Sequence, residues 1–211
     1  MATFGRKPSH VYIPDKYRNE DPEAIRAFIA ANAFGILVSQ GPAGPMATHL
    51  PLELGPGGEL VLYGHFARAN PQWQHIEDGQ EVLCIFNGPH SYVSSSWYRD
   101  EEVPTWNYLA VHLRGTYRQQ SEEELLAALH RMVDRYEADS DTPLSLHDMS
   151  AGTMRQIRGI VGFTVSAAQV DAAFKLSQGR EADHPRITAE LDKRGGLSAA
   201  VAREMKNPSR S

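Results

Sequence analysis

Glycine- and proline-rich turns between short apolar segments constrain the fold of this chain more than any other feature. Turn signals at residues 41–45, 55–58 and 88–90 separate apolar segments at 34–38, 46–54, 60–63, 82–87 and 91–98. Glycine and proline supply the backbone angles that tight turns need, and the segments between them have the length of strands. Short connections join antiparallel strands, whereas parallel strands need a crossover of about a dozen residues or more. The pattern therefore predicts antiparallel β-structure and not alternating βαβ units.

Helix signals lie mainly at the edges of this pattern. Asp21 and Pro22 form a helix start, and Ser121 with Glu124 has the spacing of a capping box. Residues 185–205 also favour helix, with an interruption at Gly195-Gly196. Further strands are expected at 109–117, 159–165 and 170–176. The sequence thus predicts a mainly β (α+β) fold: one barrel-like domain with peripheral helices, residues 1–180, followed by a helical C-terminal extension, residues 181–211.

Composition and charge exclude several classes of protein. The 211 residues are 41% hydrophobic and 22% charged, as in ordinary globular proteins, and the net charge of −5 offers no general attraction to nucleic acid or anionic membranes. One cysteine, Cys84, lies in an apolar segment, so disulfides within the chain are impossible. No apolar run approaches the length of a membrane span. We therefore expect a cytoplasmic protein without membrane contact.

Residues 62–73 carry the strongest single functional signal. They form the end of an apolar strand followed by a helix start, with Asn70 as N-cap and Pro71 as the first helical residue. The free N–H groups of a first helical turn carry partial positive charge, and Arg68 adds a planar fork of donors. Together they predict a seat for a phosphate group. The alternative is an ordinary strand-to-helix junction with an exposed arginine.

Other chemical signatures are missing from the sequence. There is no G-x-G-x-x-G after a strand, no G-K-[ST] phosphate loop, no G-x-S-x-G and no H-E-x-x-H. Four histidines fall near strand ends but match no metal-ligand spacing: His49, His65, His90 and His112. We therefore predict no metal site, and the sequence assigns no catalytic residue.

Six stretches of the chain carry a family resemblance. They are A-T-H-L-P at 47–51, G-H-F-A-R-A-N-P-Q-W at 64–73, F-N-G-P-H-S-Y-V-S-S-S-W-Y at 86–98, V-P-T-W-N-Y at 103–108, I-R-G-I-V-G-F at 157–163 and F-K-L-S-Q at 174–178. Each motif alone is weak, but the set in this order and spacing is specific. Together they resemble the PaiB family of FMN-binding negative transcriptional regulators, from residue 12 to about residue 191.

This resemblance implies an FMN-binding split β-barrel, of the kind shared with pyridoxamine-phosphate oxidases and small flavin reductases. It also implies a homodimer with FMN in the groove between the two subunits. The segment that holds the FMN phosphate in related flavoproteins corresponds here to His65, Ala67, Arg68 and Asn70. Many relatives place a lysine near the helix start, where this chain has Gln72 and Trp73. The second positive charge would then come from Arg68 or from Lys175.

The flavin ring needs a flat apolar slot with donors along its polar edge. By the same resemblance, one strand offers backbone N–H groups, and aromatic residues with their neighbours offer walls. The strand residues are Thr48, His49, Leu50 and Pro51; the wall residues are Trp97, Thr105, Trp106 and Asn107. Alternatively, the aromatic residues fill the dimer interface or the mouth of the barrel.

Three functions remain open at the level of sequence. The family implies a flavin-binding repressor, although charge does not support DNA as a partner: the basic residues of the tail are few and interrupted by Glu204, and a solvated helix face explains them as well. These basic residues are Lys193, Arg194, Arg203, Lys206 and Arg210. The second function is a small FMN-dependent oxidoreductase with an unknown substrate. The third is a flavin-storing or flavin-sensing module that acts through a protein partner.

Overall fold

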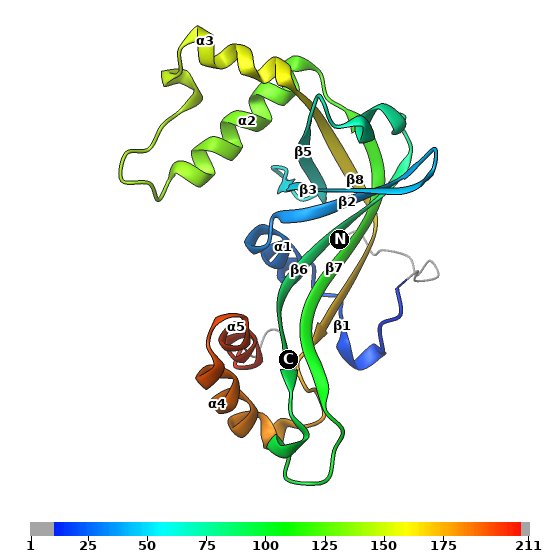
Figure 1. Ribbon diagram of the computed structural model, residues 1–211, viewed down its shortest axis with the longest axis vertical. Coiled ribbons are helices and arrows are strands. Elements are labelled where there is room, and N and C mark those ends of the chain that lie inside the picture. The colour runs from blue at the N-terminus through cyan, green and yellow to red at the C-terminus, as the bar shows by residue number, and fades with distance from the viewer. Residues whose placement is uncertain (1–10, 208–211) are drawn as a thin grey trace. The chain divides into compact units, whose positions relative to one another are not determined.

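The computed structural model describes residues 11–207, which form two compact units. Unit 1 contains the chain up to Asn32, residues Ile85–His112 and the chain from Gln169 onward. Unit 2 contains Ala33–Cys84 and Leu113–Ala168. Three long strands, which lie side by side in Figure 1, run through both units: β6 (Glu81–Val93), β7 (Thr105–Gln119) and β8 (Ile160–Lys175).

The sheet contains eight strands in the order β3-β2-β6-β7-β8-β5-β4, with β1 paired to β8. The shorter strands are β1 (Arg18–Asn19), β2 (Phe34–Gly41), β3 (Gly44–Pro51), β4 (Glu53–Leu54) and β5 (Val61–Ala67). The pairs β1–β8, β2–β3, β4–β5 and β5–β8 are antiparallel. The mainly β, α+β class that the turns predicted is therefore confirmed.

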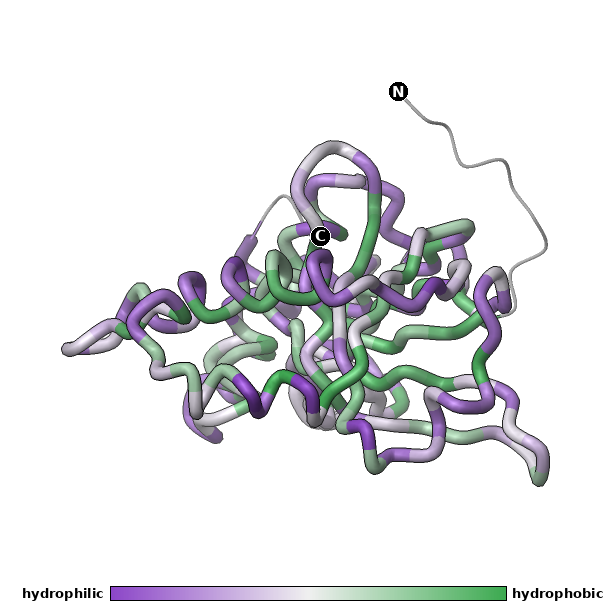
Figure 2. The backbone as a smooth tube through the Cα atoms, turned by 90° about the horizontal axis from the view of Figure 1, so that it is seen from above, coloured by the Kyte–Doolittle hydropathy of each residue, from purple (hydrophilic) through white to green (hydrophobic). Residues whose placement is uncertain are grey.

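Five α-helices and six short 3₁₀ turns complete the described chain. The helices are α1 (Pro22–Ala31), α2 (Glu122–Glu137), α3 (Ala151–Met154), α4 (His184–Arg194) and α5 (Gly196–Met205). The 3₁₀ turns are η1 (Asp15–Tyr17), η2 (Pro71–His75), η3 (Ser95–Trp97), η4 (Leu146–Asp148), η5 (Arg155–Gly159) and η6 (Glu181–Asp183). Figure 2 shows hydrophobic and hydrophilic stretches alternating along the backbone of the described chain.

The predicted helix starts are confirmed. The Asp21 carboxylate accepts a hydrogen bond from the Glu23 N–H at the start of α1, and Ser121 and Glu124 form the reciprocal capping box of α2. The helical tail is also interrupted where expected, because Gly195 between α4 and α5 has a φ of 70° that favours glycine. The start at Asn70 is correct, but it opens only the 3₁₀ turn η2 rather than a longer helix.

One predicted turn is wrong. Residues 88–90 (Gly-Pro-His) lie inside the continuous strand β6. A Cβ on Gly88 would lie 2.5 Å from Cε2 of Phe28, so this glycine allows α1 to pack closely against the strand. In this fold Gly88 matters because it lacks a side chain and not because it forms a turn, and the sequence pattern does not separate these two uses.

The two strands predicted at 159–165 and 170–176 are one continuous strand, β8. In unit 2 this strand pairs with β5, for instance His65 with Gly162, and in unit 1 it pairs with β1 through Ala172 and Ala173. No glycine or proline interrupts residues 163–178, so nothing in the chain forces a turn there.

Aromatic side chains form much of the core of unit 2. Phe163 of β8 lies between Phe66 of β5 and Tyr117 of β7, with ring centroids 4.9 Å and 5.4 Å apart. All three side chains are buried. Such tilted aromatic pairs add to the stabilisation from burial. Burial also raises the pKa of the Tyr117 hydroxyl to about 12, with Asp78 as a second cause.

The core of unit 1 combines α1 with the C-terminal helices. The rings of Phe28 and Phe174 lie 5.4 Å apart, and α4 and α5 bury Ile187, Leu191 and Val201. Figure 1 shows α4 and α5 side by side, as their mutual contacts require. Both helices belong to the same compact unit as α1. The division between a barrel domain and an extension at residue 180 stays a prediction.

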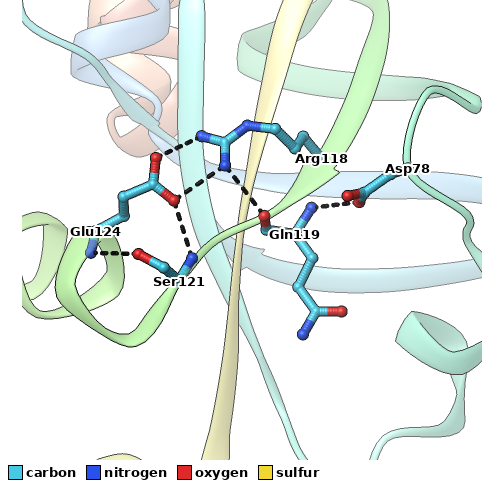
Figure 3. A network of polar contacts seen from close by, with 5 residues as sticks. All are labelled: Asp78, Arg118, Gln119, Ser121 and Glu124. Atoms are coloured by element: carbon cyan, nitrogen blue, oxygen red, sulfur yellow. Dashed lines mark hydrogen bonds and ion pairs between the residues drawn. The ribbon is translucent and has the colours of Figure 1, made fainter.

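A polar network fastens the start of α2 to β7 (Figure 3). Arg118 Nη1 and Nη2 donate to the two carboxylate oxygens of Glu124 at 2.9 Å and 2.8 Å, and the Ser121 N–H donates to the same carboxylate. The Gln119 N–H donates to Asp78 at 2.7 Å. These contacts lower the pKa of Glu124 to about 2. The hydrogen bond from Arg118 is the largest cause, and the backbone hydrogen bond from Ser121 is the next.

Acid should weaken this network in a defined pH window. The pKa of Glu124 is lower in the folded protein, at about 2, than its ordinary value of 4.5, so its stabilising contribution is present above pH 4.5 and is lost as the pH falls toward 2. We expect the urea midpoint of Glu124→Gln to lie below that of the wild type at neutral pH and to approach it between pH 4.5 and 2. Glu123→Gln, which alters the preceding exposed glutamate, should show no such convergence. A constant difference between Glu124→Gln and wild type down to pH 2 would contradict this assignment.

Candidate functional site

Arg68 follows the end of β5 in unit 2 and is held by backbone carbonyl groups. Its Nε donates to the Arg158 carbonyl at 2.7 Å, and its Nη2 donates to the Ile160 carbonyl at 3.0 Å. The Trp73 indole N–H donates to the Arg68 carbonyl, and the guanidinium lies 6.0 Å from the Trp73 ring centroid. The guanidinium is therefore oriented before any ligand arrives, and Nη1 takes part in none of these bonds.

Charge distinguishes Arg68 from several other arginines. Among the described residues 11–207, no carboxylate forms an ion pair with Arg68, whereas Arg118 and Arg135 of the same unit pair with Glu124 and Glu53. Backbone carbonyls orient a guanidinium without neutralising it. An exposed, oriented arginine with its full charge is suited to bind a phosphate or carboxylate group.

Asn70 begins a hydrogen-bond chain that joins η2 to β3. Its side-chain oxygen accepts from the Gln72 N–H at 2.9 Å, and its Nδ2 donates to Thr48 Oγ1 at 2.9 Å. Thr48 Oγ1 in turn donates to Gln72 Oε1 at 2.6 Å. Thr48 and Asn70, which the sequence placed in one site, are thus in direct contact. The five-residue turn η2 contributes only a short dipole, so the positive charge here comes mainly from Arg68.

Gln72 is the important residue whose role the sequence did not reveal. Its side chain is only 1% exposed, and Nε2 donates to the Leu37 carbonyl, the Ser39 hydroxyl and the Met46 carbonyl. It therefore ties η2 to both strands of the β2–β3 hairpin. The resemblance marked Gln72 and Trp73 as a departure near the helix start, but a buried amide and an exposed one look alike in a sequence.

The predicted residues of β3 differ in what they expose. The Leu52 N–H donates to the Ala33 carbonyl, just beyond the paired residues of β3 and β2. Successive N–H groups of an antiparallel strand point alternately toward and away from the partner strand, so the His49 N–H, three residues earlier, points away from β2. Leu50 is buried, whereas the exposed His49 ring stacks on Phe34 with centroids 6.3 Å apart. Pro51 has no N–H to offer. Of the residues 48–51, His49 is therefore the one whose N–H points out of the ladder.

His65 and Ala67 lie on the same face of β5. Their cross-strand partners on β8 are Gly162 and Ile160. Burial lowers the pKa of His65, which favours its neutral form. A neutral imidazole can donate or accept a hydrogen bond but adds no charge for a phosphate. Ala67 is exposed at the end of the strand, next to Arg68.

The remaining predicted residues lie in unit 1. Thr105 and Lys175 are in direct contact, with Lys175 Nζ donating to Thr105 Oγ1 at 2.5 Å. The Trp106 side chain is 54% exposed and contacts the rings of His90 and Tyr92, with centroids 5.9 Å and 6.4 Å away. Tyr92 is also exposed. Trp106 is therefore open to a planar ligand.

Trp97 and Asn107 are turned inward. Arg194 lies over the Trp97 ring, with its guanidinium carbon 4.3 Å from the ring centroid. The Asn107 amide is fully buried, and it exchanges hydrogen bonds with the Ser177 hydroxyl. These side chains are engaged within unit 1, and their assignment to a cofactor site stays a prediction.

Comparison with known proteins identifies the family. The model of the family described as "Putative FMN-binding domain" matches residues 11–169. The chain is 38% identical over 198 residues to "Protease synthase and sporulation protein PAI 2" of Bacillus subtilis (strain 168), covering 92% of this chain and 96% of that protein. The chain belongs to the PaiB family. FMN is thus the cofactor of this PaiB-family protein, and the donors of unit 2 suit its phosphate.

Solved structures support the same fold. The FAD- and haem-binding protein of Mycobacterium smegmatis has a TM-score of 0.60 at 12% identity, over 75% of this chain and 73% of that one. The flavocytochrome Anf3 of Azotobacter vinelandii has a TM-score of 0.59 at 18% identity, over 75% and 69%. The PaiB-family chain is therefore a split-barrel protein, as the resemblance implied.

Two further expectations concern metals and membranes. Within residues 11–207 the structure contains no group of three or more histidine, cysteine, aspartate or glutamate side chains placed to hold a metal ion. Likewise, none of the helices in that described range has the length and apolarity to cross a membrane.

Proposed function

We propose that this PaiB-family chain is an FMN-binding negative regulator of transcription, with Arg68 as the anchor of the FMN phosphate. The observation that carries the FMN site is the orientation of Arg68 by two backbone carbonyls without a carboxylate partner in the described chain. Asn70, two positions after Arg68, forms a hydrogen-bond network with Thr48, and the two would position the ligand. When bound, FMN supplies a redox-active ring that the side chains of the protein lack.

The ring contacts in this proposal come from residues with exposed surfaces or free donors. In unit 2, the outward N–H of His49 would donate to the polar edge of the ring. In unit 1, taken by itself, the exposed Trp106 would offer an aromatic face to a planar ligand. The neutral His65 would add one hydrogen bond and no charge. Pro51 and Ala67 would contribute contact surface, the buried Leu50 would support β3 from the core, and Lys175 is considered separately below.

The regulatory part of the proposal is supported by the name of the Bacillus subtilis relative, which connects that protein with protease synthesis and sporulation. The basic tail does not add support for direct contact with DNA. Arg194 stacks on Trp97 and keeps its charge, but Lys193 pairs with Glu190 at 2.6 Å and Lys206 pairs with Asp192 at 2.7 Å. Neutralised cations attract DNA phosphates weakly. Arg210, which belonged to the predicted basic group, lies outside the described residues.

The oriented Arg68, which carries the proposed FMN site, is equally compatible with the alternative function, a small FMN-dependent oxidoreductase. An absorption spectrum and aerobic NAD(P)H oxidation, followed by a promoter-fragment shift assay, separate the two. We expect a yellow protein that shifts promoter DNA from its own genome and oxidises NAD(P)H no faster than free FMN. A yellow protein that turns over NAD(P)H and shifts no fragment would establish the alternative. A colourless protein that does not take up FMN would overturn both.

We further propose that the chain is a cytoplasmic homodimer with FMN at the subunit interface. Large aromatic side chains are exposed in each unit: Phe34 is 69% exposed in unit 2 and Trp106 is 54% exposed in unit 1. Exposed groups of this kind often mark interfaces. Light scattering of the FMN-loaded protein should give twice the chain mass, and Phe34→Ser should shift the equilibrium toward monomer.

A control variant makes this prediction specific. Tyr12 is 89% exposed, so Tyr12→Ser also removes an exposed aromatic side chain. We expect this variant to keep the mass of the wild type, which would show that the effect of Phe34→Ser is specific to Phe34. A monomer mass for the wild type with flavin still bound would contradict the dimer.

A further inference from the structure

We infer that unit 1 contains a second anion site, formed by Lys175, Thr105, Tyr17 and Lys16, which binds the phosphate or carboxylate group of a small molecule other than FMN. This inference rests on the proposed function, because it takes Arg68 as the anchor of the FMN phosphate. It gives a separate role to Lys175, which the resemblance had offered as an alternative anchor. The ligand would be a substrate or effector that carries one anionic group.

The ammonium group of Lys175 is half-buried between neutral groups. Its Nζ donates to Thr105 Oγ1 at 2.5 Å and lies 5.3 Å from the centroid of the Tyr17 ring. The hydroxyl group and the aromatic face both stabilise a cation, but neither neutralises it. An ammonium group has three N–H donors, and these contacts use one of them in a hydrogen bond. Donors therefore remain for a ligand.

A second positive charge lies on the same aromatic ring. Nζ of Lys16 is 4.9 Å from the centroid of Tyr17, so the ring contacts two ammonium groups. Within residues 11–207, neither lysine forms an ion pair with a carboxylate. Other cations of unit 1 do: Arg18 pairs with Asp171 at 3.2 Å, and Arg180 pairs with Glu102. The cluster therefore brings two ammonium groups without a carboxylate partner in that range onto one aromatic ring.

The backbone holds the cluster in place. Lys175 is the last residue of β8 and Thr105 the first of β7, so both side chains are carried by long strands. Tyr17 ends η1, directly before β1, which pairs with β8 through Arg18 and Ala173. Side chains on such paired strands are well positioned, which lowers the entropic cost of binding a small anion. Alternation along β7 turns Trp106 to the opposite face from Thr105.

The test uses the FMN-saturated protein, in which the phosphate seat at Arg68 is filled by its own ligand. Thermal unfolding midpoints are measured against inorganic phosphate or acetate, with chloride added to keep the ionic strength constant. We expect one of the two anions to raise the midpoint in a saturable way, which also tells whether the site prefers phosphate or carboxylate. Lys175→Gln keeps a donor for Thr105 but removes the charge, and should weaken the apparent anion affinity at least about tenfold.

Three further variants complete the design. Lys175→Arg keeps the charge and should retain the anion effect. Lys206→Gln removes a lysine that already pairs with Asp192, and should behave like the wild type. Arg68→Gln separates the two proposals: if FMN binds through Arg68, this variant loses FMN affinity but keeps the phosphate or acetate effect once it is saturated with FMN.

Two outcomes would overturn the inference. In the first, neither anion raises the unfolding midpoint of the wild type, or each anion raises the midpoint of Lys175→Gln as much as that of the wild type. Either result would mean that Lys175 binds no free anion. In the second, Lys175→Gln loses FMN affinity while its riboflavin affinity is unchanged, which would make Lys175 the FMN phosphate anchor. The second outcome also overturns the role proposed for Arg68, whereas the first leaves that role intact.

Discussion

Arg68→Gln should weaken FMN binding by about ten- to hundred-fold and leave riboflavin binding almost unchanged. A charge-assisted hydrogen bond to a phosphate contributes roughly 1.5–3 kcal/mol, and riboflavin has the same ring without the phosphate. Glutamine can still donate to one of the carbonyls of Arg158 and Ile160, so the variant removes charge with limited disturbance of the backbone. Titration of the apoprotein with each flavin, followed by flavin fluorescence, measures both affinities.

Trp106→Ala provides the matched comparison. If this exposed indole covers the ring, its removal should weaken FMN and riboflavin alike, because both ligands carry the same ring. Equal weakening of the two flavins by Arg68→Gln would show that Arg68 supports the local fold through its carbonyl contacts. The phosphate would then bind elsewhere, with Lys175 as the next candidate.

Gln72→Ala should lower the free energy of unfolding by about 2–4 kcal/mol, because buried polar partners lose their hydrogen bonds. The amide group donates to the Leu37 and Met46 carbonyls and accepts from Thr48. Alanine would leave these groups buried without this partner and would also leave a cavity in the core. FMN affinity should fall in the same variant, since Thr48 loses its hydrogen bond to the Gln72 side chain and keeps the one from Asn70. Urea unfolding at neutral pH measures the change in stability.

Gln74→Ala is the control for this prediction. Gln74 lies in the same 3₁₀ turn and is exposed, so its replacement should change stability by less than about 0.5 kcal/mol. A Gln72→Ala variant as stable as Gln74→Ala would mean that the β2–β3 hairpin does not depend on the buried amide.

Local chemistry was readable from the chain alone. Helix starts at Asp21 and Ser121 depend on side chains that bond to the nearest backbone N–H groups, so three or four residues contain the whole interaction. The break at Gly195 is equally local, because a positive φ is a property of one residue. The family motifs gave information over a longer part of the sequence and identified FMN as the cofactor. Several short motifs in a fixed order are more specific than any one of them.

Contacts between distant segments were decided only by the tertiary structure. Gly88 looked like a turn residue, but its role is set by Phe28, sixty positions away in the chain, whose ring occupies the space of a side chain. Gln72 looked like a departure from a phosphate-binding lysine, but it is the buried link between η2 and the β2–β3 hairpin. In both cases the deciding group comes from another element, so the residue type alone was compatible with either role.

The sequence by itself therefore determined the antiparallel class, the helix caps and the cofactor family of this protein. The tertiary structure decided which charges are available to a ligand. Arg68 and Lys175 are held by uncharged partners and keep their charge, whereas Lys193 and Lys206 are paired with carboxylates. Whether a cation is neutralised depends on distances of a few ångströms between side chains, and such distances exist only after the chain has folded.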